Sequence, residues 1–183
     1  MAHLKLENNP ISSVSQTIFE TTQKALGFVP TMYKDMGNNP ALLDAYTYSY
    51  HSFRANSGFN SVEQEVVFLS VAYENNCEYC MAAHSFVGDM MTKVPAEVTN
   101  AIRDGKQIPD VKLAALSKLT RSLTVTRGNV SQEEVEAFLA VGYTEGHVLG
   151  IIAGIAVKTM SNYSNHITSP KLDAAFAGRV WKK

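Results

Sequence analysis

Cysteine and tryptophan are scarce in this sequence, which narrows the class of protein. The 183 residues include only two cysteines and one tryptophan. A chain of this length with 45% apolar residues can bury a core without the disulfide bonds on which small secreted domains depend. In a reducing cytosol, a close cysteine pair indicates catalysis or metal binding rather than a structural crosslink.

A surplus of positive charge is also missing. Sixteen basic and seventeen acidic residues leave a formal net charge of -1, so nothing in the composition favours binding to the phosphates of a nucleic acid. We expect no nucleic-acid partner.

Long hydrophobic runs are absent as well. The first twelve residues, MAHLKLENNPIS, lack the apolar core of a signal peptide. The longest uncharged apolar run near the C-terminus, GHVLGIIAGIAV at 146–157, is shorter than the roughly 20 residues that cross a bilayer. We therefore expect a soluble, cytoplasmic protein with no membrane partner.

The hydrophobic pattern predicts helices throughout and no strand. We expect an all-α fold, with residues 1–183 forming a single-domain bundle of about seven or eight helices. Start and stop signals place helical segments at about 11–26, 31–36, 40–56, 61–74, 77–91, 95–105, 110–127 and 131–142, and a last helix from 144 that ends in NYSNHI, 162–167. The last of these is apolar on nearly all sides, which is typical of a central helix or a subunit interface.

The capping signals are specific in two places. Ser61 and Gln64 have the spacing of a capping box, as do Ser131 and Glu134. In this motif the two side chains cover each other's unpaired backbone donors at the start of a helix.

The chemistry of the chain is concentrated at residues 65–84, EVVFLSVAYENNCEYCMAAH. On a helix, Cys77, Cys80 and His84 fall within roughly 60° of one another, so two thiols and an imidazole share one face. The preceding asparagine pair places both cysteines in the first turn, where free amides and the helix dipole favour a thiolate. His84 can exchange a proton near neutral pH.

Glu65 lies on the preceding helix. If the two helices pack antiparallel, its carboxylate reaches the same pocket and orients His84 or a water molecule. Together these groups predict dithiol chemistry, with an attacking thiolate, a resolving thiol, a base and a residue that orients the base.

Other readings of these residues stay open. Two cysteines and a histidine also suit zinc, although no fourth ligand and no second cysteine pair is evident. The cysteines could be inert and buried, and a glutamate early in a helix is usually a solvated residue. A non-enzymatic, redox-sensing or metal-binding oligomer is the alternative function.

The pattern Glu-x11-Cys-x2-Cys-x3-His resembles the alkylhydroperoxidase-D-like (AhpD-like) branch of the carboxymuconolactone decarboxylase superfamily. The flanking segments GFVPTMYKDMGNNPALLDAY and AVGYTEGHVLGIIAGIAVKTMSNYSNHI are similar to that family's N-terminal and C-terminal helices. The resemblance covers most of residues 27–168, the expected core. It implies an all-helical domain and a homo-oligomer, from dimer to hexamer.

The resemblance implies thiol-dependent peroxide reduction or disulfide exchange, with no cofactor and no metal. Cys80 would attack the peroxide or disulfide substrate, and Cys77 would resolve the product to a disulfide. Glu65 and His84 would form a proton relay, and a thiol reductant or redox partner protein would restore the thiols. Decarboxylation is not expected, because the decarboxylase branch lacks the cysteine pair.

The position of the cysteines on their helix leads to a different choice of nucleophile. Helix electrostatics alone favour Cys77 as the more acidic thiol. We follow the relay and choose Cys80, because His84 lies one helical turn from it and nearly two from Cys77. The sequence departs from the best-known family members at Tyr79, where they carry a histidine.

Four further residues are possible pocket members: Tyr79, His51, Asn162 and His166. Asn162 and His166 also suit the end of a helix, where asparagine caps and histidine interacts with the dipole. His51 also suits an exposed position on its helix.

Overall fold

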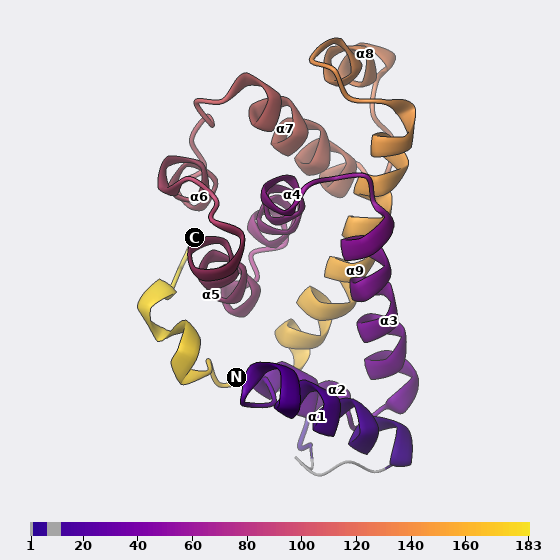
Figure 1. Cartoon of the computed structure of the whole chain (residues 1–183), viewed down its shortest axis with the longest axis vertical. Coiled ribbons are helices and arrows are strands. Elements are labelled where there is room, and N and C mark those ends of the chain that lie inside the picture. Colours follow the sequence, from indigo (N-terminus) through magenta and orange to yellow (C-terminus); the bar gives the residue numbers. More distant parts are fainter. Residues whose placement is uncertain (1, 7–11) are drawn as a thin grey trace.

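The computed structural model describes residues 2–6 and 12–183, and the fold is all-α, as predicted (Figure 1). Ile11, the first residue of the predicted N-terminal pattern, lies outside the described residues. The helices are α1 Ser13–Leu26, α2 Thr31–Met36, α3 Pro40–Asn56, α4 Ser61–Glu74, α5 Glu78–Val87, α6 Ala96–Arg103, α7 Val111–Val125, α8 Gln132–Ala140 and α9 Glu145–Thr168. A π-helical segment, η1 Gly88–Thr92, follows α5, and a 3-10 helix, η2 Ala174–Arg179, lies near the C-terminus.

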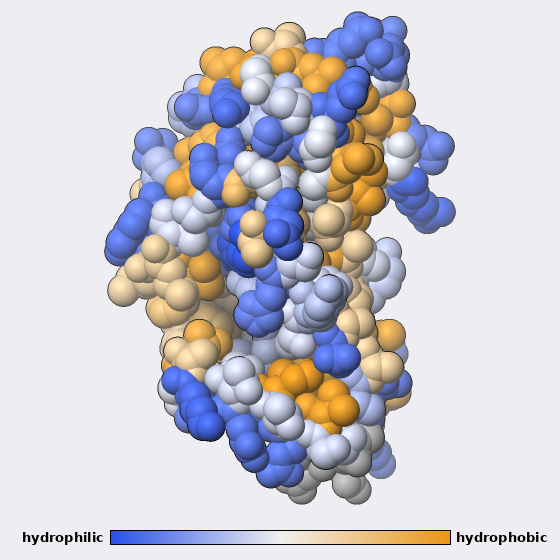
Figure 2. All heavy atoms as spheres, turned by 45° about the vertical axis from the view of Figure 1, so that its right-hand side comes forward, coloured by the Kyte–Doolittle hydropathy of each residue, from blue (hydrophilic) through white to orange (hydrophobic). Residues whose placement is uncertain are grey.

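Helix α4 is the centre of the fold, packed against α5, α6, α7 and α9. All ten residues from Glu63 to Ala72 are buried. The sequence predicted that the last helix, apolar on nearly all sides, is central in the fold or lies at a subunit interface. In the structure, α9 buries one face and exposes Leu149 and Ile152 on another. On the face drawn in Figure 2, hydrophobic side chains reach the surface in patches separated by hydrophilic ones.

Two glycines let α9 pack closely against its neighbours. A Cβ at Gly150 would lie 2.8 Å from the Ser57 carbonyl oxygen, and one at Gly154 would lie 2.6 Å from Val67 Cγ1. Any larger residue would push the helices apart. One helical turn after Gly154, the same buried face carries Lys158, and polar side chains continue along it.

The capping chemistry is mostly local and mostly as predicted. The box at Ser131 and Glu134 is present. The box predicted at Ser61 and Gln64 is wrong by one residue, because Asn60 caps α4 and pairs with Glu63. Asn60 is an equally good cap.

The turn between α4 and α5 makes the two helices pack against each other. Asn75 ends α4, and Asn76 takes a left-handed conformation with φ 52°, which asparagine tolerates better than most residues. Cys77 is the N-cap of α5. The α-helical geometry predicted to about Met91 ends at Val87, where the π-helical segment begins.

The C-terminal segment folds back onto the bundle. Helix η2 packs against α5, and the Trp181 indole Nε1 donates to the Arg103 carbonyl at 2.8 Å. Within residues 2–6 and 12–183, no single helix combines the length and apolar character of a membrane span. The one combination that passes joins α8 and α9 across a bend of 111°.

Candidate active site

Glu65 on α4 and His84 on α5 meet in the interior. His84 Nδ1 lies 2.9 Å from Glu65 Oε2, and no part of the Glu65 side chain reaches solvent. The antiparallel packing of consecutive helices brings these residues together across nineteen positions.

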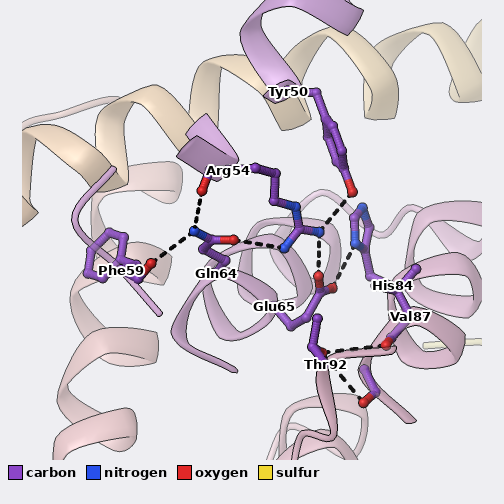
Figure 3. Close-up of polar contacts among 9 residues, drawn as sticks. Tyr50, Arg54, Phe59, Gln64, Glu65, His84, Val87 and Thr92 are labelled. Atoms are coloured by element: carbon purple, nitrogen blue, oxygen red, sulfur yellow. Dashed lines mark hydrogen bonds and ion pairs between the residues drawn. The ribbon is translucent and has the colours of Figure 1, made fainter. Parts of the chain in front are cut away.

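Arg54 on α3 also reaches this carboxylate, at its other oxygen (Figure 3). Its Nη2 donates to Glu65 Oε1 and, at 2.9 Å, to the Tyr50 hydroxyl, while Nη1 donates to Gln64 Oε1 at 3.1 Å. The guanidinium carbon lies 4.9 Å from the ring centroids of both Tyr50 and Phe68. The sequence analysis did not identify Arg54, although its spacing of four from Tyr50 put both on one helix face.

These contacts determine the protonation of the pair. Burial opposes ionisation of Glu65, but hydrogen bonds from His84 and Arg54 outweigh it and hold the pKa of Glu65 below its ordinary value. An ionised carboxylate can only accept hydrogen bonds. His84 therefore carries its hydrogen on Nδ1 and leaves Nε2 free to take a proton.

His84 is itself neutral at pH 7. Burial, and next the positive charge of Lys158, lower the pKa of His84 below 6.5, and the attraction of Glu65 offsets this only in part. The result is a buried, neutral imidazole held in one tautomer.

The two cysteines are free and buried, and they lie close together. Asn165 Nδ2 on α9 lies 3.2 Å from Cys80 Sγ and 3.5 Å from Cys77 Sγ. The Ser161 hydroxyl is 3.7 Å from Cys80 Sγ. Polar side chains of α9 thus face the sulfur pair. The sequence analysis missed Ser161 and Asn165.

The surroundings shift the pKa values of the two thiols in opposite directions. Burial would raise the pKa of Cys80, but a hydrogen bond from the Cys77 thiol and the charge of Lys158 hold it well below 9.0. The same hydrogen bond, followed by burial, raises the pKa of Cys77 above its usual range. Cys80 is therefore the more acidic of the two thiols, although Cys77 lies nearer the start of the helix.

Lys158 is a further site residue that was not identified from the sequence. Its side chain is 0% exposed, and its Nζ has no hydrogen-bond partner among the described residues. Nζ lies 5.4 Å from the ring centroid of Phe68. The sequence did contain a signal for this residue, because a lone lysine ends an apolar run on a helix face that is otherwise buried.

Cys80, His84 and Lys158 all line one pocket of about 630 Å³. Cys77 does not line it, so within the described part of the chain Cys80 is the cysteine that lines the pocket. The wall is mainly apolar and aromatic, with Ile18, Leu26, Met32, Tyr33, Tyr46, Tyr50, Tyr79, Val87, Met91 and Phe176 among its residues.

Tyr79 attaches the C-terminal segment to this wall. Its hydroxyl donates to Asp173, which also accepts a 2.8 Å hydrogen bond from the Thr31 hydroxyl. Burial and the contact with Asp173 raise the pKa of Tyr79 above its usual range. Phe176 packs edge-on against the Tyr79 ring at 5.9 Å. Tyr79 therefore joins α5, α2 and the segment around η2.

The other sequence candidates divide into two groups. His51 and Tyr79 line the pocket. Asn162 is buried behind it and accepts a 2.9 Å hydrogen bond from Asn75. His166 is exposed and does not line the pocket. In the part of the chain that the structure describes, no three His, Cys, Asp or Glu side chains are grouped to hold a metal ion.

Neither protein-family models nor curated protein sequences match this chain. Solved structures do match. A peroxidase-related protein from Silicibacter sp. TM1040 aligns with TM-score 0.83 and 20% identity, over 97% of this chain and 95% of its own. An AhpD-core, peroxidase-related protein from Ralstonia eutropha JMP134 aligns with TM-score 0.82 and 19% identity, over 98% and 100%.

The debrominase Bmp8 is also similar, with TM-score 0.75 and 18% identity over 96% of both chains. A cysteine-to-alanine variant of that protein was solved with 2,3,4-tribromopyrrole and aligns equally well at 17% identity. At these identities the similarity establishes the fold. The chain has the AhpD-like fold, as the resemblance in its sequence implied.

Proposed function

We propose that this protein is a thiol-dependent, two-electron reductase of the alkylhydroperoxidase type, acting on a peroxide or a disulfide. One observation carries the proposal: Cys80 is the cysteine that lines the pocket beside His84, and its pKa is held well below 9.0, so we assign it as the thiolate. A thiolate is the reactive form of cysteine. No cofactor and no metal takes part in the proposed reaction.

The first step consumes the peroxide. The Cys80 thiolate attacks the terminal peroxide oxygen, the O–O bond breaks, and Cys80 becomes a sulfenic acid. The leaving alkoxide takes a proton from solvent by way of His84, because its free Nε2 can accept and return one. An alcohol is released.

The second step forms the disulfide. The main cause of the raised Cys77 pKa is its hydrogen bond to the Cys80 sulfur, and that cause disappears once the thiolate is oxidised. Cys77 can then give its proton to His84 and attack Cys80 Sγ. The hydroxyl leaves with this proton as water. A thiol reductant or a redox partner protein returns two electrons and two protons.

A second candidate reaction is reductive dehalogenation of an aromatic compound. Two features of the pocket favour this reaction, its aromatic wall and its volume of about 630 Å³. A small peroxide needs neither. The similar protein Bmp8 is described as a debrominase. Cys80 would take the halogen from the ring, the ring carbon would take a proton, and Cys77 would displace the halide as the disulfide forms.

Thiol counting tests the proposal. One equivalent of an organic hydroperoxide should remove two free thiols per chain, and dithiothreitol should restore both. A halogenated pyrrole in place of the peroxide, with halide release measured, distinguishes the second candidate. Stoichiometric zinc in the purified protein, or no thiol loss with either oxidant, would contradict both and favour a metal-binding or purely structural pair.

We also propose that the chain forms a homo-oligomer in the cytoplasm. Leu149, Ile152, Tyr163 and Ile167 form an apolar stripe along α9, with exposed fractions between 46% and 67%. Apolar stripes of this kind commonly mark subunit interfaces. Light scattering that reports a monomer at micromolar concentration would contradict this.

A further inference from the structure

The charged groups at the pocket leave Lys158 with one candidate counter-ion. Glu65 is engaged by Arg54 and His84, and His84 is neutral. No carboxylate of the described residues forms an ion pair with Lys158. The anion that remains beside it is the Cys80 thiolate.

Lys158 nevertheless makes no direct bond to that sulfur. The hydrogen bonds at Cys80 Sγ involve Asn165, Ser161 and Cys77, and Lys158 Nζ has no partner among the described residues. The ammonium lines the pocket, so its three hydrogens have space to meet a small ligand or water.

Oxidation removes the counter-ion. The reduced pair consists of the Cys77 thiol and the Cys80 thiolate, with a charge of minus one. When a two-electron oxidant takes the electrons and the Cys77 proton leaves, the product is a neutral disulfide. Lys158 then remains as a cation in a mainly apolar, buried place, which is unfavourable unless an anion joins it.

We propose that disulfide formation turns the Lys158 end of the pocket into a binding site for a halide ion, which the reduced protein binds far more weakly. A small monovalent anion restores the charge that the thiolate supplied. The pocket wall is mainly apolar, so bromide, which loses water more easily than chloride or fluoride, should bind best. The inference uses the thiolate assignment made under the proposed function but requires no catalytic turnover.

Because bromide binding depends on the redox state, the Lys158 site should have a measurable effect on the dithiol–disulfide equilibrium. A ligand that binds only the oxidised form stabilises it by mass action. Above the dissociation constant, each tenfold rise in free bromide should shift the dithiol–disulfide equilibrium tenfold toward the disulfide. For a two-electron couple, this lowers the reduction potential by about 30 mV.

The test uses the full-length protein in halide-free gluconate buffer. One sample is reduced. The other is oxidised with diamide, which takes up two electrons and two protons and becomes a hydrazine. Bromide binding is then measured by calorimetry. We expect one bromide per oxidised chain and at least tenfold weaker binding to the reduced chain.

Lys158→Met should abolish bromide binding to the oxidised chain, whereas Lys171→Met, at an exposed position, should retain it. If Lys158→Met does not fold, the equilibrium of the wild-type protein with dithiothreitol at several bromide concentrations gives the answer. Equal binding in both redox states, no binding to the disulfide form, or an equilibrium insensitive to bromide would overturn the inference. Because diamide forms the disulfide, these outcomes do not depend on peroxide or dehalogenase activity.

Discussion

Asn165 Nδ2 lies 3.2 Å from Cys80 Sγ, although 85 residues separate the two in the sequence. The contact joins the last helix to the cysteine helix. It belongs to a polar face of α9, which begins one turn after the close contact at Gly154 and includes Lys158 and Ser161. The polar surroundings of Cys80 Sγ therefore come from α9 as well as from its own helix.

The two cysteines should respond differently to substitution. Cys80→Ser should abolish peroxide consumption, because it removes the attacking thiolate. Cys77→Ser should retain the first step, because the serine hydroxyl can still donate to Cys80, and should accumulate a sulfenic acid. Dimedone labelling followed by peptide mass spectrometry locates this acid. Finding it on Cys77 in Cys80→Ser would reverse the assignment.

Glu65→Gln should destabilise the fold as well as slow the reaction. The substitution leaves the Arg54 guanidinium, largely buried, without its carboxylate. Removing one partner of a buried pair typically costs about 3 kcal/mol or more of unfolding free energy. Glu74→Gln breaks the more exposed pair with Arg121 and should cost about 1 kcal/mol or less. Urea unfolding of both variants measures the difference.

A double variant separates charge from packing. If Arg54→Met restores part of the stability lost in Glu65→Gln, the unpaired cation is the cause. Additive losses from the two substitutions would instead show that the pair does not interact as described.

Stability should fall on mild acidification. The pKa of His84 is below 6.5 in the folded protein, so the unfolded chain binds more protons as the pH drops below 6.5, and the free energy of unfolding decreases. Glu65, whose folded pKa is also lowered, adds a further loss below its ordinary 4.5. Urea unfolding between pH 5 and pH 8 should show the first decline, and His84→Gln should flatten it. An unchanged slope in that variant would contradict the neutral-histidine assignment.

Local patterns predicted much of the fold. Helix periodicity and caps depend on residues a few positions apart, so the helices were located to within a few residues. The capping box of α4 was displaced by one position because Asn60 and Ser61 are both good caps. The π-helical turn after Val87 has no comparable signal in the sequence.

The candidate site was only partly predictable for the same reason. Glu65 and His84 lie on consecutive helices, so antiparallel packing alone places them near each other. Arg54, Lys158 and Asn165 come from α3 and α9, and their places depend on how those helices cross α4. No spacing within the sequence specifies that crossing.

Tyr79→Phe should loosen the C-terminal segment. It removes the hydroxyl that donates to Asp173 and keeps the ring that packs on Phe176. A lost hydrogen bond to a charged partner is worth about 1.5–3 kcal/mol. Amide hydrogen exchange over residues 173–181 should accelerate, while Tyr48→Phe, at an exposed tyrosine, should leave it unchanged. Equal exchange in both variants would mean that Asp173 holds the segment through Thr31 alone.

The central claim is that Cys80 is a thiolate at neutral pH, stabilised by Cys77 and Lys158. The most direct measurement is the rate of Cys80 alkylation by iodoacetamide against pH, with the labelled cysteine identified by mass spectrometry. We predict a midpoint well below 9.0 for Cys80 in the wild-type protein, and a higher midpoint in Lys158→Met. A wild-type midpoint at or above 9.0, or faster labelling of Cys77 than of Cys80 at pH 7, would contradict the account.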